Sequence, residues 1–316
     1  SVYFVLLCAA SCPPVWTAVA SAEEPLEPDP VVQAEEVVVS ATKTPVPVSQ
    51  VTSAVEVITA QDMKKQNIRN VADALRLAQG LAVFSNGGPG TEVNARIRGG
   101  SSSQTLVLID GAIVNSGTLG SYNFANLTTD NIERVEVLRG AQSMLWGSDA
   151  MGGVINIVTK RGQGPLSATG FMEYGSFASL REGGMVSGKQ GAVDYSFSLS
   201  RWDTSSFSAV NYRRGAGERD SYRNWQGSGR IGVDLPKDGR LDFTMRWMNS
   251  DVQLDSVSAT SPSDVYGSKN RSQEYVFSGS YEQPLTGWWS QKLTLARAQE
   301  ASQFLSGTLQ RSLITG

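Results

Sequence analysis

Residues 193–200 read VDYSFSLS, a strict alternation of apolar and polar side chains. Side chains two apart lie on the same face of a strand, so one face here is apolar and the other carries Asp194 and three serines. The same alternation recurs at residues 241–247, 275–281 and 292–295. Strands of this kind suit a wall between lipid and a wet lumen, and they also fit a soluble β-sandwich.

The connections between these strands alternate in length. Tight turns are expected at residues 189–191, 236–239 and 284–287, and long polar connections at 204–219 and 252–270. Short turns at one end and long loops at the other are typical of outer-membrane barrels. Tryptophans near the expected strand ends fit an aromatic girdle, namely Trp202, Trp225, Trp247, Trp288 and Trp289. The pattern favours a membrane all-β barrel over the sandwich.

The composition argues against several classes of protein. The 316 residues carry 27 Lys and Arg against 30 Asp and Glu, a net charge of −3, which disfavours a nucleic-acid binder. Histidine is absent from the sequence, which excludes a Ser-His-Asp triad and a His-ligated metal site within it. The two cysteines are Cys8 and Cys12. No nucleophile–base or paired-carboxylate motif stands out, so we expect no enzyme.

The first 22 residues carry no charge, and they combine an apolar run at 2–7 with A-x-A patterns at 18–22. This pattern predicts a secretory signal peptide, removed after Ala20 or Ala22. Because it lacks an initiator Met and a basic start, we expect the sequence to begin inside the signal. Farther along there is no apolar run of about 18 residues, so no transmembrane helix is expected.

Residues 51–162 predict a compact α+β unit. A short strand at 55–58 leads to Thr59 and Asp62, which have the spacing of a helix capping box. Asn70 can cap a second helix. Leu106–Ile109 and Ala112–Val114 flank Asp110-Gly111, a dipeptide typical of a two-residue hairpin turn.

Three strings of this sequence resemble the TonB-dependent outer-membrane receptors, and within them most of all the cobalamin (vitamin B12) transporter-like group. They are EEVVVSATKT at 35–44, NARIRGGSSSQTLVLIDG at 94–111 and IERVEVLRGAQSMLWGSDAMGGVINIVTK at 132–160. The resemblance implies a 22-stranded barrel around an N-terminal α+β plug domain. At about twenty residues a strand, we expect this sequence to hold a truncated N-terminal part with about seven to eight strands.

The resemblance also implies a domain order and a location. Residues 1–22 would be the signal peptide, 23–50 a periplasmic linker with a TonB box, 51–162 the plug, and 163–316 the first part of the barrel. The implied location is the outer membrane of a Gram-negative bacterium. The implied partners are TonB with its ExbB–ExbD motor, outer-membrane lipid and a metal chelate. We expect a monomer, no nucleic acid and no intrinsic cofactor.

The string near residue 40 resembles the TonB box. A short β-branched segment behind a flexible spacer can pair as an added strand with a partner's sheet. The alternative is an ordinary first strand of the plug. The expected TonB-box residues are Glu36, Val37, Val38, Val39, Ser40 and Ala41.

Arg98 and Arg139 match plug arginines that pair with barrel-wall glutamates in relatives. A guanidinium is always charged and must be paired when it is buried, so such pairs would lock the plug in the barrel. The alternative is that both side chains are exposed at the plug surface.

Relatives contact their ligand with plug apices and outer barrel loops. The matching positions here are polar and carry one aromatic ring, which suits a large polar chelate; single residues among them can equally be plain connectors. The residues are Asn86, Thr91, Ser101, Ser102, Asn115, Ser116, Thr118, Leu119, Ser121 and Tyr122.

Cobalamin receptors hold calcium in an acidic outer loop. The loop at 207–225 here offers Glu218 and Asp220 among four arginines, a poor set of ligands for calcium but a suitable one for an anionic ligand. The predicted function is TonB-dependent active import of a scarce metal chelate, either cobalamin or a ferric siderophore. The alternative is a passive barrel that serves as a surface binding or adhesion protein or as a bacteriocin or phage receptor.

Overall fold

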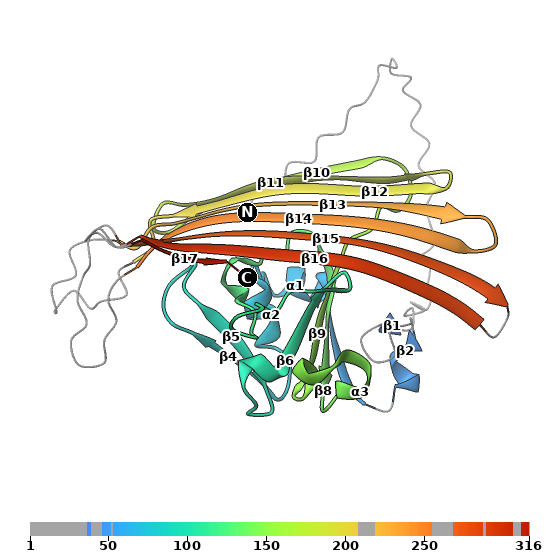
Figure 1. Cartoon of the computed structure of the whole chain (residues 1–316). Coiled ribbons are helices and arrows are strands. Elements are labelled where there is room, and N and C mark those ends of the chain that lie inside the picture. The colour runs from blue at the N-terminus through green and yellow to red at the C-terminus, as the bar shows by residue number, and fades with distance from the viewer. Residues whose placement is uncertain are drawn as a thin grey trace, which may run out of the picture.

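The computed structural model describes residues 37–38, 46–51, 53–207, 219–254, 268–286, 289–305 and 311–315. The described chain forms a curved eight-stranded antiparallel sheet, which we call the wall, and an α+β plug that lies against one face of it (Figure 1). The predicted signal peptide at 1–22 lies outside the described residues, as does most of the predicted linker at 23–50.

Each strand of the wall pairs with its neighbours in the chain. The expectation of about seven to eight barrel strands behind an α+β plug is therefore confirmed. The strands are β10 (Ser167–Gly175), β11 (Ser179–Gln190), β12 (Val193–Thr204), β13 (Tyr222–Leu235), β14 (Gly239–Gln253), β15 (Lys269–Thr286), β16 (Trp289–Leu305) and β17 (Arg311–Thr315).

The two faces of the wall differ in chemistry, as the alternation predicts. The face toward the plug buries charged and polar side chains such as Asp194, Arg230 and Glu274. The opposite, outer face exposes large apolar side chains; Phe243 is 55% exposed and Leu295 is 71% exposed. An apolar outer face over a polar inner face is the arrangement of a barrel wall in lipid.

The apolar band on the outer face crosses the strands obliquely. Tyr174 on β10 and Gln303 on β16 belong to one row of register partners. The outward apolar residues of β10 reach Tyr174, whereas the unbroken outward apolar run of β16 ends at Leu295, eight residues before Gln303. Strands tilted by about 40° and spaced about 4.8 Å apart shift by roughly seven residues over six steps. The oblique course of the band is therefore the one expected for the tilted strands of a barrel.

The plug is built around a five-stranded sheet with the order β3-β8-β9-β6-β7, in which β6 and β9 are parallel. A hairpin of β4 and β5 and three short helices complete it. The elements are β3 (Ala54–Thr59), α1 (Ala60–Lys65), α2 (Val71–Leu75), β4 (Leu81–Ser85), β5 (Val93–Ile97), β6 (Thr105–Ile109), β7 (Ala112–Ile113), β8 (Ile132–Arg139), α3 (Ser143–Trp146) and β9 (Gly153–Thr159).

The local signals in the plug sequence act mostly as predicted. The Thr59 hydroxyl accepts from the Asp62 N–H, and the Asp62 carboxylate accepts from the Thr59 N–H, so the capping box is present. Asp110 and Gly111 both have positive φ, as the tight hairpin turn requires. Asn70 occupies the N-cap of α2, but its side chain makes no capping hydrogen bond there. No helix in the described part of the chain is long and apolar enough to span a membrane.

Candidate functional site

The segment that resembles a TonB box is partly described. Val37 and Val38 form β1 (Val37–Val38), which pairs with β2 (Val46–Pro47), and Val38 is fully buried. Val37 and Val38 therefore form a short strand that pairs with another segment of the same chain. The other four expected residues, Glu36, Val39, Ser40 and Ala41, lie outside the described residues.

The hairpin turn of the plug docks on the wall through Asp110. Its carboxylate accepts hydrogen bonds from the Thr159 N–H and hydroxyl, at 3.0 and 2.7 Å, and lies 3.4 Å from the Arg230 guanidinium of β13. The Asp110 carbonyl accepts from the Ser278 hydroxyl of β15. Both members of the Asp110–Arg230 ion pair are buried, with side chains 7% and 6% exposed. One turn thus joins two plug strands to two wall strands.

A network of charges extends from this contact along the wall. Arg230 pairs with Asp242, and Asp242 pairs with Arg240, which also reaches Asp194 at 2.7 Å. Arg161, just after the plug, lies 3.9 Å from Asp242. Burial lowers the pKa of the Arg161 guanidinium, and the nearby positive charge of Arg230 adds to this. Alternating signs let several buried charges share partners, which a single isolated charge could not do.

A second contact joins the plug to the first two wall strands. The Arg181 guanidinium of β11 pairs with both Asp130 of the plug and Glu173 of β10. Glu173 also accepts from Arg69 of the plug at 2.8 Å. The Lys160 ammonium donates to the Asp130 carbonyl, and burial lowers the pKa of this group. Asp130, Arg181, Glu173 and Arg69 therefore form a linear chain of ion pairs between plug and wall.

A third contact is made by the 3-10 turn at Phe124–Asn126. The Asn126 carbonyl accepts from the side-chain amides of Asn224 and Gln226, at 2.9 and 2.5 Å. The Tyr222 hydroxyl donates to the Asn126 side-chain oxygen at 3.1 Å. The plug is thus fixed to β13 by hydrogen bonds that use both the backbone and the side chain of one residue.

Arg98 and Arg139 lie elsewhere on the plug. Arg139, at the end of β8, pairs with Glu56 at 3.3 Å and donates to the Gln79 carbonyl, both inside the plug. Arg98 is exposed and has φ +50°. The opposite end of β8 follows Asn131, which donates to Ser228 of the wall. Both arginines therefore sit away from the wall strands that the structure describes, and their pairing with wall glutamates stays a prediction.

Two of the predicted ligand residues have structural roles. Asn115 accepts from the Val107 N–H and donates to the carbonyls of Thr105 and Gly120, so all its side-chain atoms hold its own loop together. The Tyr122 hydroxyl donates to the Glu274 carboxylate of β15 at 3.2 Å. Burial, followed by the Glu274 charge, raises the pKa of Tyr122 well above its usual value. These contacts place the loop at 115–122 against the wall.

A small cavity of about 40 Å³ lies between this loop and the wall. It is lined by Asn115, Ser116 and Tyr122 from the plug and by Glu274 and Glu300 from the wall. Its volume admits a water molecule but not a metal chelate. Thr118 and Leu119 lie on the exposed side of the same loop, and their role in binding stays a prediction.

The remaining predicted ligand residues gather around two nearby loops. Gly120 approaches Ser103, so the segment with Ser101 and Ser102 lies beside the loop that contains Ser121. Asn86 donates to Glu92, and the Thr91 hydroxyl donates to the Gly88 carbonyl, which shapes the β4–β5 loop. A Cβ on Gly90 would lie 2.3 Å from the Tyr222 ring, so this loop touches the wall. Their role in binding stays a prediction.

The described residues contain no cluster of three or more candidate metal-ligating side chains. Asp220 is described and buried, whereas Glu218 lies outside the described residues.

The residues that join plug and wall were missed at the sequence level. Asp110 was assigned only to a turn, and Arg181 and Arg230 were not singled out. One signal was available, because a charged side chain on the inner face of a strand needs a partner in the lumen. The sequence does not say which plug residue supplies it.

Comparison with known proteins adds the family. Residues 47–154 match the model of the TonB-dependent Receptor Plug Domain. The chain carries a TonB-dependent receptor plug domain. It is also 36% identical over 154 residues to the vitamin B12 transporter BtuB of Photobacterium profundum, which covers 49% of this chain and 25% of that protein. The resemblance to TonB-dependent receptors, close to the cobalamin transporter group, is thereby confirmed.

Solved structures of similar fold cover more of the chain. The ferripyoverdine receptor of the outer membrane of Pseudomonas aeruginosa matches 89% of this chain and 39% of its own, with 18% identity and a TM-score of 0.71. The siderophore receptor PiuA of Acinetobacter baumannii matches 82% and 38%, with 19% identity and a TM-score of 0.66. At this identity the likeness shows the fold of plug and barrel strands. The chain spans about a quarter of the BtuB relative that it matches.

Proposed function

We propose that the protein imports a scarce metal chelate across the outer membrane of a Gram-negative bacterium, with energy delivered through TonB and its ExbB–ExbD motor. The observation that carries this proposal is a TonB-dependent receptor plug fixed to the polar face of a barrel wall. A plug has no use in a barrel that only presents loops to a surface, and the relatives named above are a transporter and receptors. We therefore do not favour the passive barrel, and we propose no enzymatic activity.

The chain order fits this function. We propose that residues 1–22 direct export, 23–50 reach into the periplasm, 51–162 fill the barrel and 163–316 begin its wall. Within the second segment, residues 36–41 would be the TonB box. The pairing of Val37 and Val38 with β2 supports this role, because a segment held by only two residue pairs is easily released to pair with a partner's sheet.

The ligand class has two candidates. The sequence relative is a vitamin B12 transporter, which favours cobalamin, and the structural neighbours are siderophore receptors, which favour a ferric siderophore. The arginines of the loop at 207–225 suit an anionic siderophore better than they suit calcium-assisted cobalamin binding. We propose that the exposed residues around Leu119 contact whichever chelate binds.

Coupling to TonB is tested by Val38→Pro in the native-length protein, expressed in cells that lack other uptake routes. Proline removes the backbone N–H that strand addition uses, so energised uptake should be lost while ligand still binds to the cells. Val32→Pro, in the adjacent spacer, is the matched control and should import normally. Normal uptake by Val38→Pro would contradict coupling through this segment.

The ligand is tested by titration calorimetry of the purified native-length protein with cobalamin, with and without calcium. Nanomolar binding would establish cobalamin as the ligand. Absence of binding would move the proposal to ferric siderophores and leave the import mechanism as stated.

A further inference from the structure

The β4–β5 loop of the plug rests on one tyrosine of the wall. A Cβ at Gly90 would lie 2.3 and 2.6 Å from two carbons of the Tyr222 ring and 3.1 Å from the Val252 Cβ. Gly90 also has φ +82°, a conformation that favours glycine. The loop therefore approaches the wall this closely because position 90 has no side chain. Tyr222 is the first residue of β13, so the contact lies at the end of the wall with the long connections.

The Tyr222 side chain is itself held in one place. Tyr222 is only 2% exposed, and the Trp202 ring meets its ring edge to face, with 5.4 Å between the centroids. The Tyr222 hydroxyl donates to the Asn126 side-chain oxygen at 3.1 Å, and the Asn126 carbonyl is bonded to two amide side chains of β13. A tyrosine with a packed ring and a bonded hydroxyl has one preferred orientation. Tyr222 therefore offers Gly90 a fixed surface.

A second link ties the loop to the 3-10 turn at Phe124–Asn126. Asn123 precedes this turn, and its side-chain oxygen accepts from the Val93 N–H of β5 at 2.9 Å and from the Ala125 N–H at 3.0 Å. The end of the β4–β5 loop is thus attached to the turn, and the turn is bonded to the wall. Tyr222 contacts both of these plug segments, one with its ring and the other with its hydroxyl.

We propose that Tyr222 is a positioning residue for ligand binding, which fixes the loop at 86–91 relative to the wall. Asn86 and Thr91 of this loop are predicted ligand residues, whereas Tyr222 is buried beneath Gly90 and acts through the loop. A loop that is held in place before the ligand arrives loses less conformational freedom on binding. The proposal rests on the proposed function, because it takes the loop to contact the imported chelate.

The first test measures hydrogen exchange of the native-length protein without any ligand, read on peptides that span the loop. The Thr91 N–H, which bonds to the Gly88 carbonyl, is among the amides that report on the loop. Tyr222→Phe removes the hydroxyl from the wall side, and Asn126→Ala removes its acceptor from the plug side. We expect each variant to raise exchange in the loop about fivefold, and the double variant to raise it no further.

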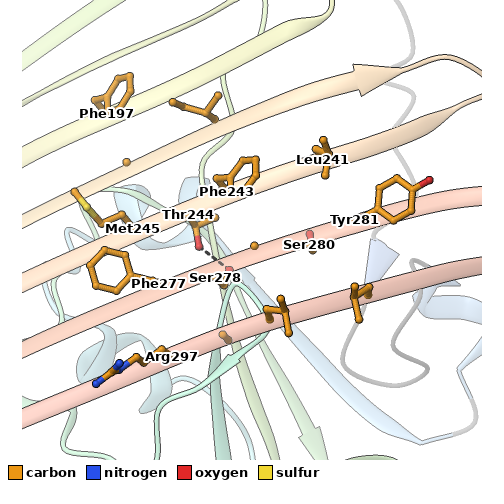
Figure 2. Close-up of a pocket in the computed structure, with 16 residues that line it drawn as sticks. Phe197, Leu241, Phe243, Thr244, Met245, Phe277, Ser278, Ser280, Tyr281 and Arg297 are labelled. Atoms are coloured by element: carbon orange, nitrogen blue, oxygen red, sulfur yellow. Dashed lines mark hydrogen bonds between the residues drawn. The ribbon is translucent and has the colours of Figure 1, made fainter.

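Tyr281→Phe is the matched control. Tyr281 lies on the outer face of β15, where it lines an apolar hollow with Phe243 and Phe277 (Figure 2), and its hydroxyl lies 3.5 Å from the Gln283 side-chain oxygen. Loss of this hydroxyl, on the face away from the plug, should leave exchange in the loop unchanged. Unchanged exchange in Tyr222→Phe, or an equal rise in the loop and in β9, would overturn the proposal.

The second test measures affinity by titration calorimetry, with cobalamin and ferripyoverdine as probes. For whichever probe the unmodified protein binds, Tyr222→Phe should weaken binding about fivefold, whereas Tyr281→Phe should leave it unchanged. Unchanged affinity of Tyr222→Phe would overturn the role of Tyr222 in ligand binding. If the unmodified protein binds neither probe, the proposed ligands are wrong, and the exchange test, which needs no ligand, still decides whether Tyr222 fixes the loop.

Discussion

The plug is held together in one way and held to the wall in another. Inside the plug, buried apolar side chains form two clusters, the larger of which includes Leu75, Ile109 and Ile155. Between plug and wall, the contacts are ion pairs and hydrogen bonds centred on Asp110, Asp130 and Asn126. Among the described wall residues, Val276 alone joins the apolar cluster.

Because of this difference, the interactions that keep the plug folded (cohesion) are distinct from those that fix it to the wall (attachment). Apolar burial is non-directional and is lost only when water reaches the core, so it keeps the plug folded. Polar contacts are satisfied in one register, and water can replace them at a modest net cost of about 1 kcal/mol each. We therefore expect the plug to keep its fold when its polar contacts with the wall are broken.

The largest effect should come from removing an apolar side chain from the core of the plug. Ile155→Ala removes a fully buried side chain of β9, and we expect a loss of about 2–5 kcal/mol of plug stability. Hydrogen exchange of the β8 and β9 amides in the native-length protein measures it. Met144→Ala, at a fully exposed position, is the control and should change stability by less than about 0.5 kcal/mol. Equal protection of β9 in both variants would show that the apolar cluster does not hold the plug together.

A smaller effect should follow from removing a polar contact between the plug and the wall. Asp110→Asn removes the charge opposite Arg230, and we expect the attachment of the plug to weaken by about 1–3 kcal/mol. Exchange should rise at Thr159, whose N–H bonds to Asp110, while the centre of β9 stays protected. A double-mutant cycle with Arg230→Gln should give a coupling of about 0.5–3 kcal/mol. A uniform rise in exchange throughout the plug would contradict the separation of cohesion from attachment.

The wall network behind Arg230 can be disturbed without touching the plug. A Cβ at Gly232 would lie 2.2 Å from the Arg240 guanidinium and 2.7 Å from the Asp194 carboxylate. We expect Gly232→Ala to displace Arg240 and to cost about 1 kcal/mol. Gly170→Ala, whose Cβ would meet only the Gly183 carbonyl at 3.6 Å, is the matched control. Thermal unfolding of the two variants compares them, and identical midpoints would remove Gly232 from the network.

The smallest expected effect is a pH dependence of the stability of helix α1 in the plug. The hydrogen bond from the Thr59 hydroxyl holds the pKa of Asp62 below its usual value near 3.8. A lowered pKa in the folded state stabilises α1 above about pH 4, and that contribution is lost as the pH falls through the folded value. Thr59→Ala should cost about 0.5 kcal/mol and return the pKa toward 3.8. The carboxylate NMR shift of Asp62 measures this, and an unchanged titration would show that Thr59 does not set it.

The sequence predicts elements better than it predicts contacts. Alternation over short windows is enough to place β12, β14, β15 and β16 and their two faces, because period two is a local property of the chain. The turn at Asp110-Gly111 and the capping box at Thr59 are also local, and both are present. The three strings that resemble the receptor family indicated a plug domain, and the family match confirms its presence.

The contacts between plug and wall depend on residues far apart in the chain. Asp110 and Arg230 are 120 residues apart, and no short-range pattern links them. For the same reason Asn115 was predicted as a ligand residue, although three hydrogen bonds give its side chain a structural task. A polar residue in the sequence indicates that its side chain needs hydrogen-bond partners. Only the folded structure determines whether these partners belong to a ligand, to the residue's own loop or to the wall.

The oblique apolar band makes each wall strand suited to only one position in the order of strands. Because the band drops by eight residues between β10 and β16, the apolar stretch of each strand is correct only at one place in the order. A copy of β16 placed where β10 stands would carry Arg297 and Gln299 into the hydrocarbon and leave Leu293 below it. Duplicating or exchanging strands of this barrel would therefore fail unless the inserted strand is also slid along its own axis.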